Sequence, residues 1–447
     1  MKKLNYEEAV DYILNVPKFT KKNPVENIKA LMMELNNPQN NRKVIHVAGT
    51  NGKGSVCAFI ESILIESNKT NGMFTSPHLV KINERFRING FIISDESFTD
   101  AFHKVIDAVD KIITKGYFHP TFFEFLFAMS MVIFEKENVE FVILETGLGG
   151  RLDATNMIDN PILTIITTID LDHTEILGNT IEKIAFEKAG IIKPNVPVVF
   201  DGMNPDVSKI IEDVAKEKEA MCYKLIGKDT LDPLEDTNFW YELLEFGHKN
   251  IDFLYKYGYD GCIRVSIGMI GEYQVKNSSL AIKAIQLLKE ENINERAILE
   301  GVKKAIWPGR MEMLLPNVYL DGAHNENGIA EFIKTVTHFP DGKKVLLFSA
   351  VMEKSYTKMI QEICDGLQFD QIVVTLLSNK RAVPLKVLQA EFEAKTKSKV
   401  YAVENVKEAF EKTLNLKTEE GIAFCVGSLY LVGEITEIVR RIEHDKF

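Results

Sequence analysis

Cysteine is scarce in this sequence, and long apolar runs are missing from it. The five cysteines are scattered through 447 residues without a C-x-x-C pair, so neither a disulfide framework nor a zinc site is indicated, and a reducing compartment fits best. No apolar run approaches the roughly 20 residues that span a bilayer. The opening residues, MKKLNYEEAVDYIL, turn acidic before a signal-peptide apolar stretch develops. We therefore expect a cytoplasmic protein.

Basic charge is also in deficit. Lys and Arg number 53 against 64 Asp and Glu, which gives a formal net charge of −11. A general electrostatic attraction to nucleic acid or to an anionic membrane is therefore not expected. Any anionic ligand must be held by a local device, and we expect small-molecule partners. Hydrophobic residues make up 45% and charged residues 26%, which excludes a disordered or fibrous chain.

The order of apolar runs predicts an α/β protein with more than one domain. Short apolar runs alternate with segments of helical period, a pattern typical of parallel sheets covered by helices. Pro308 and Gly309 end a helical segment and predict a linker at about 305–311. We predict domains at 1–304 and 305–447. The predicted strands are 44–48, 141–144, 162–169 and 196–200, antiparallel strands within 251–273, and then 318–321, 344–351, 371–375, 399–403 and 422–428.

The strongest local signal is a glycine-rich turn between a strand and a helix. The strand 44–48 runs into Gly49-Thr50-Asn51-Gly52-Lys53-Gly54-Ser55 and then into a helical run. Such a turn directs backbone N–H groups and the positive end of a helix dipole at one point, where a nucleotide phosphate can bind. Lys53 adds charge and Ser55 a hydroxyl. The strict phosphate-loop pattern is not met, because Val47 replaces the first glycine and Gly54 follows Lys53. A tight turn with an exposed Lys53 is the alternative.

This variant resembles the nucleotide-binding loop of the Mur ligase superfamily. Further segments, in family order from about residue 24 to 434, resemble folylpolyglutamate synthases and dihydrofolate synthases. The resemblance implies an N-terminal P-loop ATPase-like domain with a mostly parallel sheet and a smaller C-terminal Rossmann-like α/β domain. The matching segments are TSPHL at 75–79, ETGLGGRLDATN at 145–156, DHT at 172–174, EKAG at 187–190, WPGR at 307–310, DGAHN at 321–325 and GSLYL at 427–431.

The resemblance implies a ligase that joins the amino group of glutamate to a folate carboxylate, with ATP converted to ADP and phosphate. A carboxylate is a poor electrophile because its leaving group would be oxide, and conversion to an acyl phosphate removes that obstacle. The protein then mainly supplies positioning and charge neutralisation. Tetrahydrofolate and dihydropteroate both suit these motifs as acceptors. The family precedent also suggests a monomer.

A metal site is expected beside the phosphate loop. Glu145 follows the strand 141–144 and should project at the carboxyl edge of the sheet, where its oxygen ligands suit Mg²⁺. The resemblance adds Ser76 and His173 as ligands, and two magnesium sites are implied. A turn serine and a structural strand-end histidine are the alternatives for these two residues.

Lys188 lies in a helical stretch that Gly190 ends. From its spacing alone, Lys188 would be a last-turn lysine that complements the helix dipole. The resemblance instead implies a lysine carbamylated by CO₂, which requires that its ammonium first lose a proton.

The resemblance also distributes the substrates over the chain. Asn277 could alternatively be the N-cap of a helix over 278–288, and Phe123 could be a core residue. Lys53, Lys188 and His324 are the expected catalytic residues. The expected ATP-binding residues are those of the loop 49–55 with Asn277, Arg310 and Asp321, the pteroate-binding residues are Phe123, Leu152, Asp153 and Ala154, and the glutamate-binding residues are His324 and Ser428.

Two other functions compete with this interpretation. A peptidoglycan-precursor ligase would need a uridine-binding domain ahead of the phosphate loop, and the loop already begins at residue 49. A P-loop nucleotide switch would not need the Asp-Gly-Ala-His-Asn and Gly-Ser-Leu-Tyr-Leu segments of the second domain. The sequence leaves open the acceptor, its one-carbon form and glutamate chain length, and whether the γ or the α carboxyl is joined.

Overall fold

The computed structural model describes residues 3–16, 23–228, 236–247, 249–258, 261–352, 355–379 and 381–444. The chain divides into two compact units. The first comprises Met1–Glu242, Phe253–Ser266 and Lys276–Ala305, and the second comprises Leu243–Asp252, Ile267–Val275 and Ile306–Phe447. The long continuous part of the second unit thus begins inside the predicted linker, and two short stretches of the same unit come from earlier in the chain.

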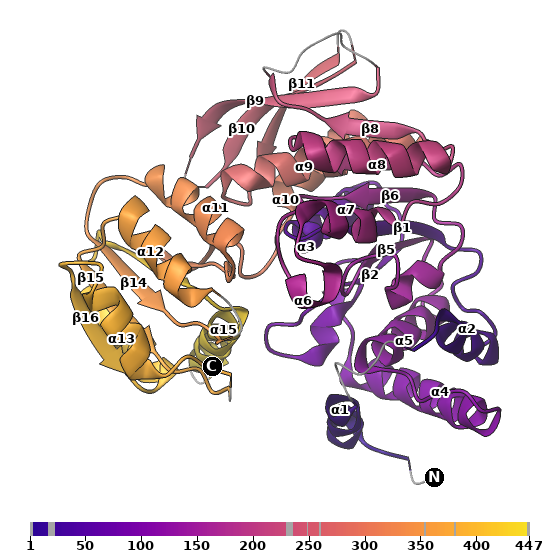
Figure 1. Cartoon of the computed structure of the whole chain (residues 1–447), viewed down its shortest axis with the longest axis horizontal. Coiled ribbons are helices and arrows are strands. Elements are labelled where there is room, and N and C mark those ends of the chain that lie inside the picture. The colour runs from indigo at the N-terminus through magenta and orange to yellow at the C-terminus, as the bar shows by residue number, and fades with distance from the viewer. Residues whose placement is uncertain are drawn as a thin grey trace. The chain divides into compact units, whose positions relative to one another are not determined.

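The larger sheet has eleven strands in the order β11-β10-β9-β8-β7-β6-β1-β5-β2-β3-β4 (Figure 1). Its central strands are parallel and almost wholly buried, as expected where helices cover both faces. The antiparallel strands β3 and β4 form one edge. The strands are β1 (Lys43–Ala48), β2 (Asn71–Phe74), β3 (Phe86–Ile88), β4 (Phe91–Ile92), β5 (Phe141–Glu145), β6 (Leu163–Ile166), β7 (Val198–Asp201), β8 (Cys222–Leu225), β9 (Asn238–Phe246), β10 (Ile251–Tyr257) and β11 (Gly261–Ile267).

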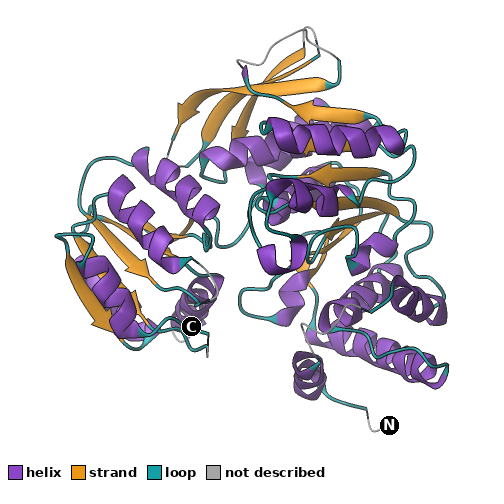
Figure 2. Cartoon of the chain, in the orientation of Figure 1, coloured by secondary structure: helices purple, strands orange, loops and turns teal. Residues whose placement is uncertain are grey.

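Helices pack along these strands (Figure 2). α5 is buried on nearly every side, which explains its apolar sequence FFEFLFAMSMVIF, and Thr121 caps it by accepting from the N–H of Glu124. The helices are α1 (Tyr6–Asn15), α2 (Val25–Glu34), α3 (Lys53–Glu66), α4 (Asp95–Thr114), α5 (Phe122–Lys136), α6 (Thr174–Leu177), α7 (Ile181–Ala189), α8 (Pro205–Glu217), α9 (Glu272–Leu288) and α10 (Glu295–Lys304).

The smaller sheet belongs to the C-terminal part and has the order β12-β13-β17-β14-β15-β16. β12 is antiparallel to β13, and the remaining neighbours are parallel. All five predicted strands form here, so the α/β class with two sheets is confirmed. The elements are β12 (Glu312–Leu315), β13 (Val318–Leu320), α11 (Glu326–Thr337), β14 (Lys344–Phe348), α12 (Tyr356–Gly366), β15 (Gln371–Thr375), α13 (Leu385–Glu393), β16 (Lys399–Val403), α14 (Val406–Leu416), β17 (Ile422–Val426) and α15 (Leu429–His444).

Several predicted boundaries are wrong. The strands predicted over 344–351 and 422–428 end at Phe348 and Val426. The strand predicted over 162–169 ends at Ile166, and the residues after it bond to the glycine turn instead: the Thr167 hydroxyl donates to the carbonyl oxygen of Asn51 at 2.7 Å. The helix predicted from Ser278 begins at Glu272, so Asn277 lies inside α9 and is not its N-cap. Within the segment predicted as antiparallel strands, 251–273, β10 and β11 form as neighbouring strands. The prediction missed β9, which runs antiparallel to β10: Gly247 N–H donates to the Asn250 carbonyl oxygen and Gly258 N–H to that of Asn238.

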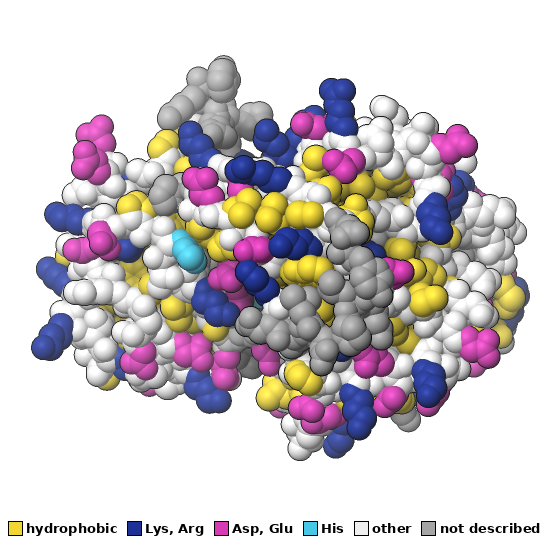
Figure 3. Space-filling model, turned by 90° about the horizontal axis from the view of Figure 1, so that it is seen from above, with side chains coloured by type: hydrophobic (Ala, Val, Ile, Leu, Met, Phe, Trp, Pro, Cys, Tyr) yellow, Lys and Arg dark blue, Asp and Glu magenta, His cyan; other side chains and the backbone are white. Residues whose placement is uncertain are grey.

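Short strands without a β-branched run escaped prediction. β2 reads Asn-Gly-Met-Phe, and its glycine is required because a Cβ on Gly72 would lie 2.5 Å from the ring of Phe134. On the face shown in Figure 3, basic and acidic side chains are interspersed among apolar and uncharged ones. In the described part of the chain, no helix is both long enough and apolar enough to cross a membrane.

Candidate active site

The predicted strand, glycine turn and helix form as β1, residues 49–52 and α3. Gly52, in the left-handed conformation with φ 88°, is the N-cap of α3, and Lys53 is the first helical residue. A Cβ on Gly49 would lie 1.8 Å from the Thr167 hydroxyl, and one on Gly52 would lie 2.4 Å from Oδ1 of Asn277. Both glycines are therefore required by close approach, and Asn277 lies directly against the loop.

The loop is anchored by the segment that follows β6. The N–H groups of Thr50 and Asn51 donate to the carbonyl oxygen of Thr168 at 2.8 and 3.3 Å. The Thr50 hydroxyl donates to the Asp170 carbonyl oxygen at 3.0 Å and accepts from the Asp170 N–H at 3.1 Å. Thr168 was missed from the sequence, although a polar pair directly after a buried strand is a usable signal.

Two lysines meet at the start of the loop. Lys188 Nζ donates to the carbonyl oxygen of Gly49 at 2.7 Å, and Lys53 Nζ donates to the same oxygen at 3.0 Å and to that of Thr50 at 3.1 Å. Lys188 is only 4% exposed, so it is not a surface lysine. Burial, together with the charge of Lys53, lowers the pKa of Lys188 to about 7, against an opposing effect of Asp172 and Asp153.

Glu145 ends β5, the strand that neighbours β1, and lies opposite Val47. Its side chain is nearly buried; Oε2 accepts from the N–H of Ser76 at 2.9 Å, and Oε1 lies 3.9 Å from Lys53 Nζ. Ser76 follows β2, the next strand along. Ser76, Glu145 and the glycine loop therefore come from the carboxyl edge of three adjacent strands, as parallel sheets arrange their sites.

His173 has a different setting. It is a left-handed residue (φ 50°) at the start of α6, its side chain is 48% exposed, and its Nε2 lies 3.9 Å from Oδ2 of Asp172. Among the described residues, no group of three or more His, Cys, Asp and Glu side chains is close enough to hold a metal ion. Mg²⁺ is commonly held by one or two carboxylates together with phosphates, so Glu145 beside an anion loop suits that ion without a complete side-chain cage.

The residues expected to bind pteroate lie on α5 and on the loop after β5. The ring of Phe123 covers Gly147, where a Cβ would be 2.7 Å from it, and also packs against Phe74 at 5.5 Å between centroids. Leu152 is 45% exposed, whereas Asp153 is buried and accepts from the N–H groups of Gly147 and Leu148. Ala154 begins a short 3-10 turn and packs against the apolar core. Leu152 is thus available to a ligand, and Asp153 shapes the loop.

In the second unit, Asp321 organises the turn that carries Arg310. Asp321 Oδ2 accepts from the N–H of Met311 at 2.9 Å and from the hydroxyl of Tyr273 at 3.3 Å, and Oδ1 accepts from the N–H of Ala323 at 2.8 Å. Burial raises the pKa of Asp321, and Arg310 and these donors oppose that rise. Tyr273 was missed, because four residues before Asn277 its sequence context predicts a strand.

His324 and Ser428 follow neighbouring strands, β13 and β17. The loops are joined by a hydrogen bond from the Gly427 N–H to the Ala323 carbonyl oxygen at 3.0 Å. His324 Nδ1 lies 2.7 Å from the Gly322 carbonyl oxygen, which can only accept, so Nδ1 carries the proton. The buried Ser428 hydroxyl accepts from the Tyr430 N–H at 3.1 Å at the start of α15.

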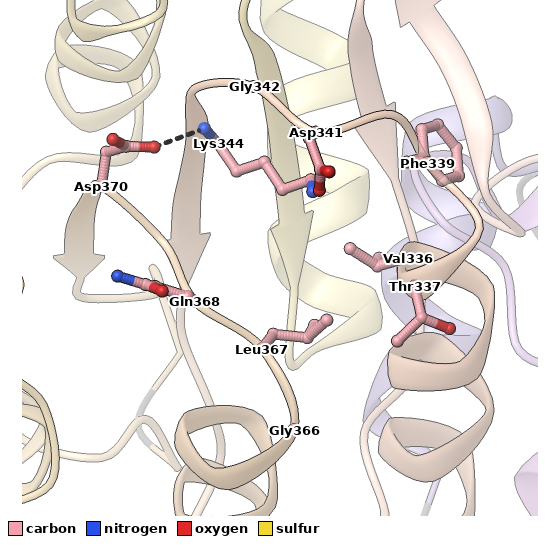
Figure 4. Close-up of a pocket in the computed structure, with 10 residues that line it drawn as sticks. All are labelled: Val336, Thr337, Phe339, Asp341, Gly342, Lys344, Gly366, Leu367, Gln368 and Asp370. Atoms are coloured by element: carbon pink, nitrogen blue, oxygen red, sulfur yellow. Dashed lines mark hydrogen bonds between the residues drawn. The ribbon is translucent and has the colours of Figure 1, made fainter.

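A separate hollow of about 420 Å³ lies at the edge of the smaller sheet where its parallel strands begin, opposite the edge that carries His324 and Ser428 (Figure 4). It surrounds the first residue of β14, and Asp370 accepts there from the backbone N–H of Lys344 at 2.8 Å. Because β13, β14 and β17 are parallel, this edge is remote from His324 and Ser428. None of the predicted site residues lines the hollow.

The chain matches known proteins over nearly its whole length. The model of the Mur ligase middle domain matches residues 47–285, and that of the Mur ligase glutamate ligase domain matches residues 309–429. The chain is 39% identical over 365 residues to the dihydrofolate synthase/folylpolyglutamate synthase of Bacillus subtilis, which covers 80% of this chain and 82% of that protein.

Solved structures agree with these matches. Folylpolyglutamate synthase from Thermotoga maritima has a TM-score of 0.84 at 30% identity, over 97% of this chain and 96% of that one. Mycobacterium tuberculosis folylpolyglutamate synthase complexed with ADP and AMPPCP has a TM-score of 0.84 at 25% identity, over 97% of this chain and 98% of that one.

Proposed function

Since the chain belongs to the Mur ligase superfamily and, within it, to the folylpolyglutamate and dihydrofolate synthases, we infer that it is an ADP-forming ligase that adds L-glutamate to folates with ATP. The observation that carries this inference is the match across both ligase domains in a chain whose glycine loop, Lys53 and Lys188 converge on one point. We further propose tetrahydrofolate and dihydropteroate as the acceptors to be compared.

The phosphates of ATP bind at the glycine loop and the N-terminus of α3, where first-turn N–H groups lack helical partners. Lys53 leaves the carbonyl oxygens of Gly49 and Thr50 and neutralises phosphate charge. A carboxylate oxygen of the acceptor attacks the γ-phosphorus and ADP leaves. The amine of glutamate then attacks the acyl phosphate, and inorganic phosphate leaves as the amide forms.

Glu145 and Ser76 would hold a magnesium ion at the carboxyl edge of β5 and β2, and His173 is proposed for a second ion. Bound magnesium would screen the charge of the transferred phosphoryl group. The position of Glu145 supports this proposal. Its carboxylate is nearly buried, and its Oε1 lies 3.9 Å from Nζ of Lys53, beside the loop where the phosphates are proposed to bind.

Lys188 is proposed to be carbamylated. A neutral Nζ attacks CO₂, a C–N bond forms, and one proton leaves, which gives an anionic carbamate. The burial of Lys188 and the pKa of about 7 support a neutral amine at physiological pH. The carbamate keeps one N–H, so the hydrogen bond to the Gly49 carbonyl oxygen can persist while the new oxygens take a magnesium ion or order a substrate.

The remaining residues receive the substrates. Phe123, Leu152, Asp153 and Ala154 form the pteroate site, and Asn277, Arg310 and Asp321 serve ATP. Because His324 Nδ1 carries its proton toward Gly322, Nε2 is the ring nitrogen that would accept a proton from a substrate. His324 is therefore proposed to take a proton from the ammonium of glutamate, and Ser428 to bind its carboxylate.

The acceptor is identified by offering tetrahydrofolate and dihydropteroate separately, each with L-glutamate, ATP and Mg²⁺, and by measuring ADP release. Release with either acceptor supports the ligase, and release with neither contradicts it. We also propose that the protein is cytoplasmic and works as a monomer. Light scattering at assay concentration tests the monomeric state directly.

A further inference from the structure

The loop after β5, Gly147–Asp153, is called the acceptor loop here because it carries residues proposed to bind the acceptor. A buried histidine in the central strand is hydrogen-bonded to a residue shortly after this loop. His46 lies in the middle of β1 with no exposed surface, and its Nε2 is 2.7 Å from the hydroxyl of Thr155, 109 residues later in the chain. The Thr155 hydroxyl is in turn 2.6 Å from Oδ1 of Asp153. Three polar side chains thus form a continuous row beneath the loop that follows β5.

The proton positions in this row follow from the chemistry of each group. The Asp153 carboxylate can only accept, so the single hydroxyl proton of Thr155 points to it. The Thr155 oxygen must then accept from His46, which places the proton of the ring on Nε2. Nδ1 of His46 is buried without a hydrogen-bond partner among the described residues. Burial and the charge of Lys193 lower the pKa of His46 to about 3, so the ring stays neutral.

The Asp153 carboxylate is hydrogen-bonded to the backbone of its own loop. Oδ2 accepts from the N–H groups of Gly147 and Leu148 at 3.0 and 2.9 Å, and Oδ1 accepts from the N–H and the hydroxyl of Thr155. These four bonds use the acceptor positions that two carboxylate oxygens ordinarily offer. The carboxylate therefore closes the loop between Gly147 and Asp153 from inside.

This loop carries the surface that a pterin ring would meet. Gly147 supports the ring of Phe123, and Leu152 is exposed. The other side of the loop is fixed to α7, because the Arg151 N–H donates to the Glu187 carbonyl oxygen at 2.7 Å. His46 itself precedes Gly49 by three residues on β1. The same strand thus positions the phosphate loop at its end and the acceptor loop from its middle.

We propose that His46 and Thr155 are positioning residues for the pterin-containing acceptor: they hold Asp153, and through it the loop Gly147–Asp153, in the shape that binds the acceptor. This inference rests on the proposed function. It predicts that breaking the row weakens acceptor binding and leaves ATP binding unchanged, because the bonds that anchor the phosphate loop come from Thr168 and Asp170.

The test compares Thr155→Val with Thr155→Ser in the full-length enzyme. Valine keeps the shape but removes the hydroxyl from both bonds, whereas serine keeps both. We expect Thr155→Val to raise the KM for the acceptor by about tenfold or more, as for loss of a hydrogen bond to a charged group, with the KM for ATP within about twofold. Thr155→Ser should match the wild type in both constants.

A second pair covers the case in which Thr155→Val does not fold. His46→Gln retains an N–H donor toward Thr155 and His46→Leu does not, so only the leucine variant should raise the acceptor KM. Nitrogen-15 NMR of the His46 ring should show the proton on Nε2 throughout pH 5–8, and a ring that titrates in that range would overturn the inference.

The outcomes separate the two proposals. If the wild type releases ADP with an acceptor but Thr155→Val and Thr155→Ser have equal KM values, or if the ATP and acceptor constants rise together, the positioning role is wrong. If the wild type shows no acceptor-dependent ADP release, the proposed function fails instead, and the NMR experiment alone still judges the predicted tautomer.

Discussion

Lys53 and Lys188 donate hydrogen bonds to a single acceptor, the carbonyl oxygen of Gly49, at 3.0 and 2.7 Å. Two cationic groups that share one acceptor in a buried setting repel each other. Lys188 is the more buried of the two, and its pKa falls to about 7. The phosphate loop thus lies beside an amine that can be neutral under physiological conditions, which is the chemical requirement for carbamylation.

Lys188→Ala should lower turnover by about two orders of magnitude or more, in the range seen when one preorganised electrostatic group is lost from an active site. ADP release at saturating ATP, folate and glutamate measures it. Lys183→Ala is the matched control, because Lys183 lies on the same helix and is exposed. Prolonged CO₂ depletion should inactivate the wild type, with recovery on adding bicarbonate. Near-normal turnover of Lys188→Ala would remove this residue from the site.

The pKa of Lys188 also predicts a pH dependence. Its folded value of about 7 lies below the ordinary 10.5, so between these values the unfolded chain binds more protons. Stability of the uncarbamylated protein should therefore rise with pH across this window, by at most about 1.4 kcal/mol per pH unit, and the full penalty applies below about pH 7. Melting temperatures in CO₂-free buffer should show this slope for the wild type relative to Lys188→Met. Parallel curves for the two proteins would contradict it.

Glu145→Gln should act through magnesium. The amide keeps an oxygen that can accept from the Ser76 N–H but loses the charge, so the Mg²⁺ concentration for half-maximal ADP release should rise by at least about tenfold. Glu212→Gln, in a surface pair with Lys224, serves as the control. Reduced activity at an unchanged Mg²⁺ requirement would show that Glu145 is not a ligand.

Asp321→Asn should loosen the turn that carries Arg310. The carboxylate accepts three hydrogen bonds on two oxygens, and asparagine offers one oxygen and an N–H₂ group that faces a donor. We expect a loss of about 1–3 kcal/mol in the free energy of unfolding and a higher KM for ATP. Asp341→Asn, at an exposed position of the same unit, should change neither. Equal stability of the two variants would mean that Asp321 does not hold the turn.

Local patterns accounted for much of the fold. The strand, turn and helix around Gly49 and Lys53 were predictable because apolar runs and glycines act within a few residues. The start of α9 was not, since the segment before Asn277 has the aromatic and glycine content of a strand while Gly271 at φ 125° already turns the chain.

Long-range contacts were beyond prediction from residue patterns. The burial of Lys188 depends on Gly49, 139 residues earlier, and the row beneath the acceptor loop joins His46 to Thr155. From local spacing alone, Asn277 could have been a helix cap, because its approach to Gly52 is made from α9, far from the loop in the sequence. Before the fold was known, only the resemblance to a family indicated Lys188 and Asn277 as site residues, and nothing indicated His46.

Ligase chemistry is tested most directly by omitting each substrate in turn. ADP is quantified alongside the mass of the folate product, with ATP and Mg²⁺ present throughout. The account predicts one ADP for each glutamyl residue added, and little ADP when either the acceptor or L-glutamate is left out. ADP formation that is insensitive to both, with no glutamylated product, would contradict it.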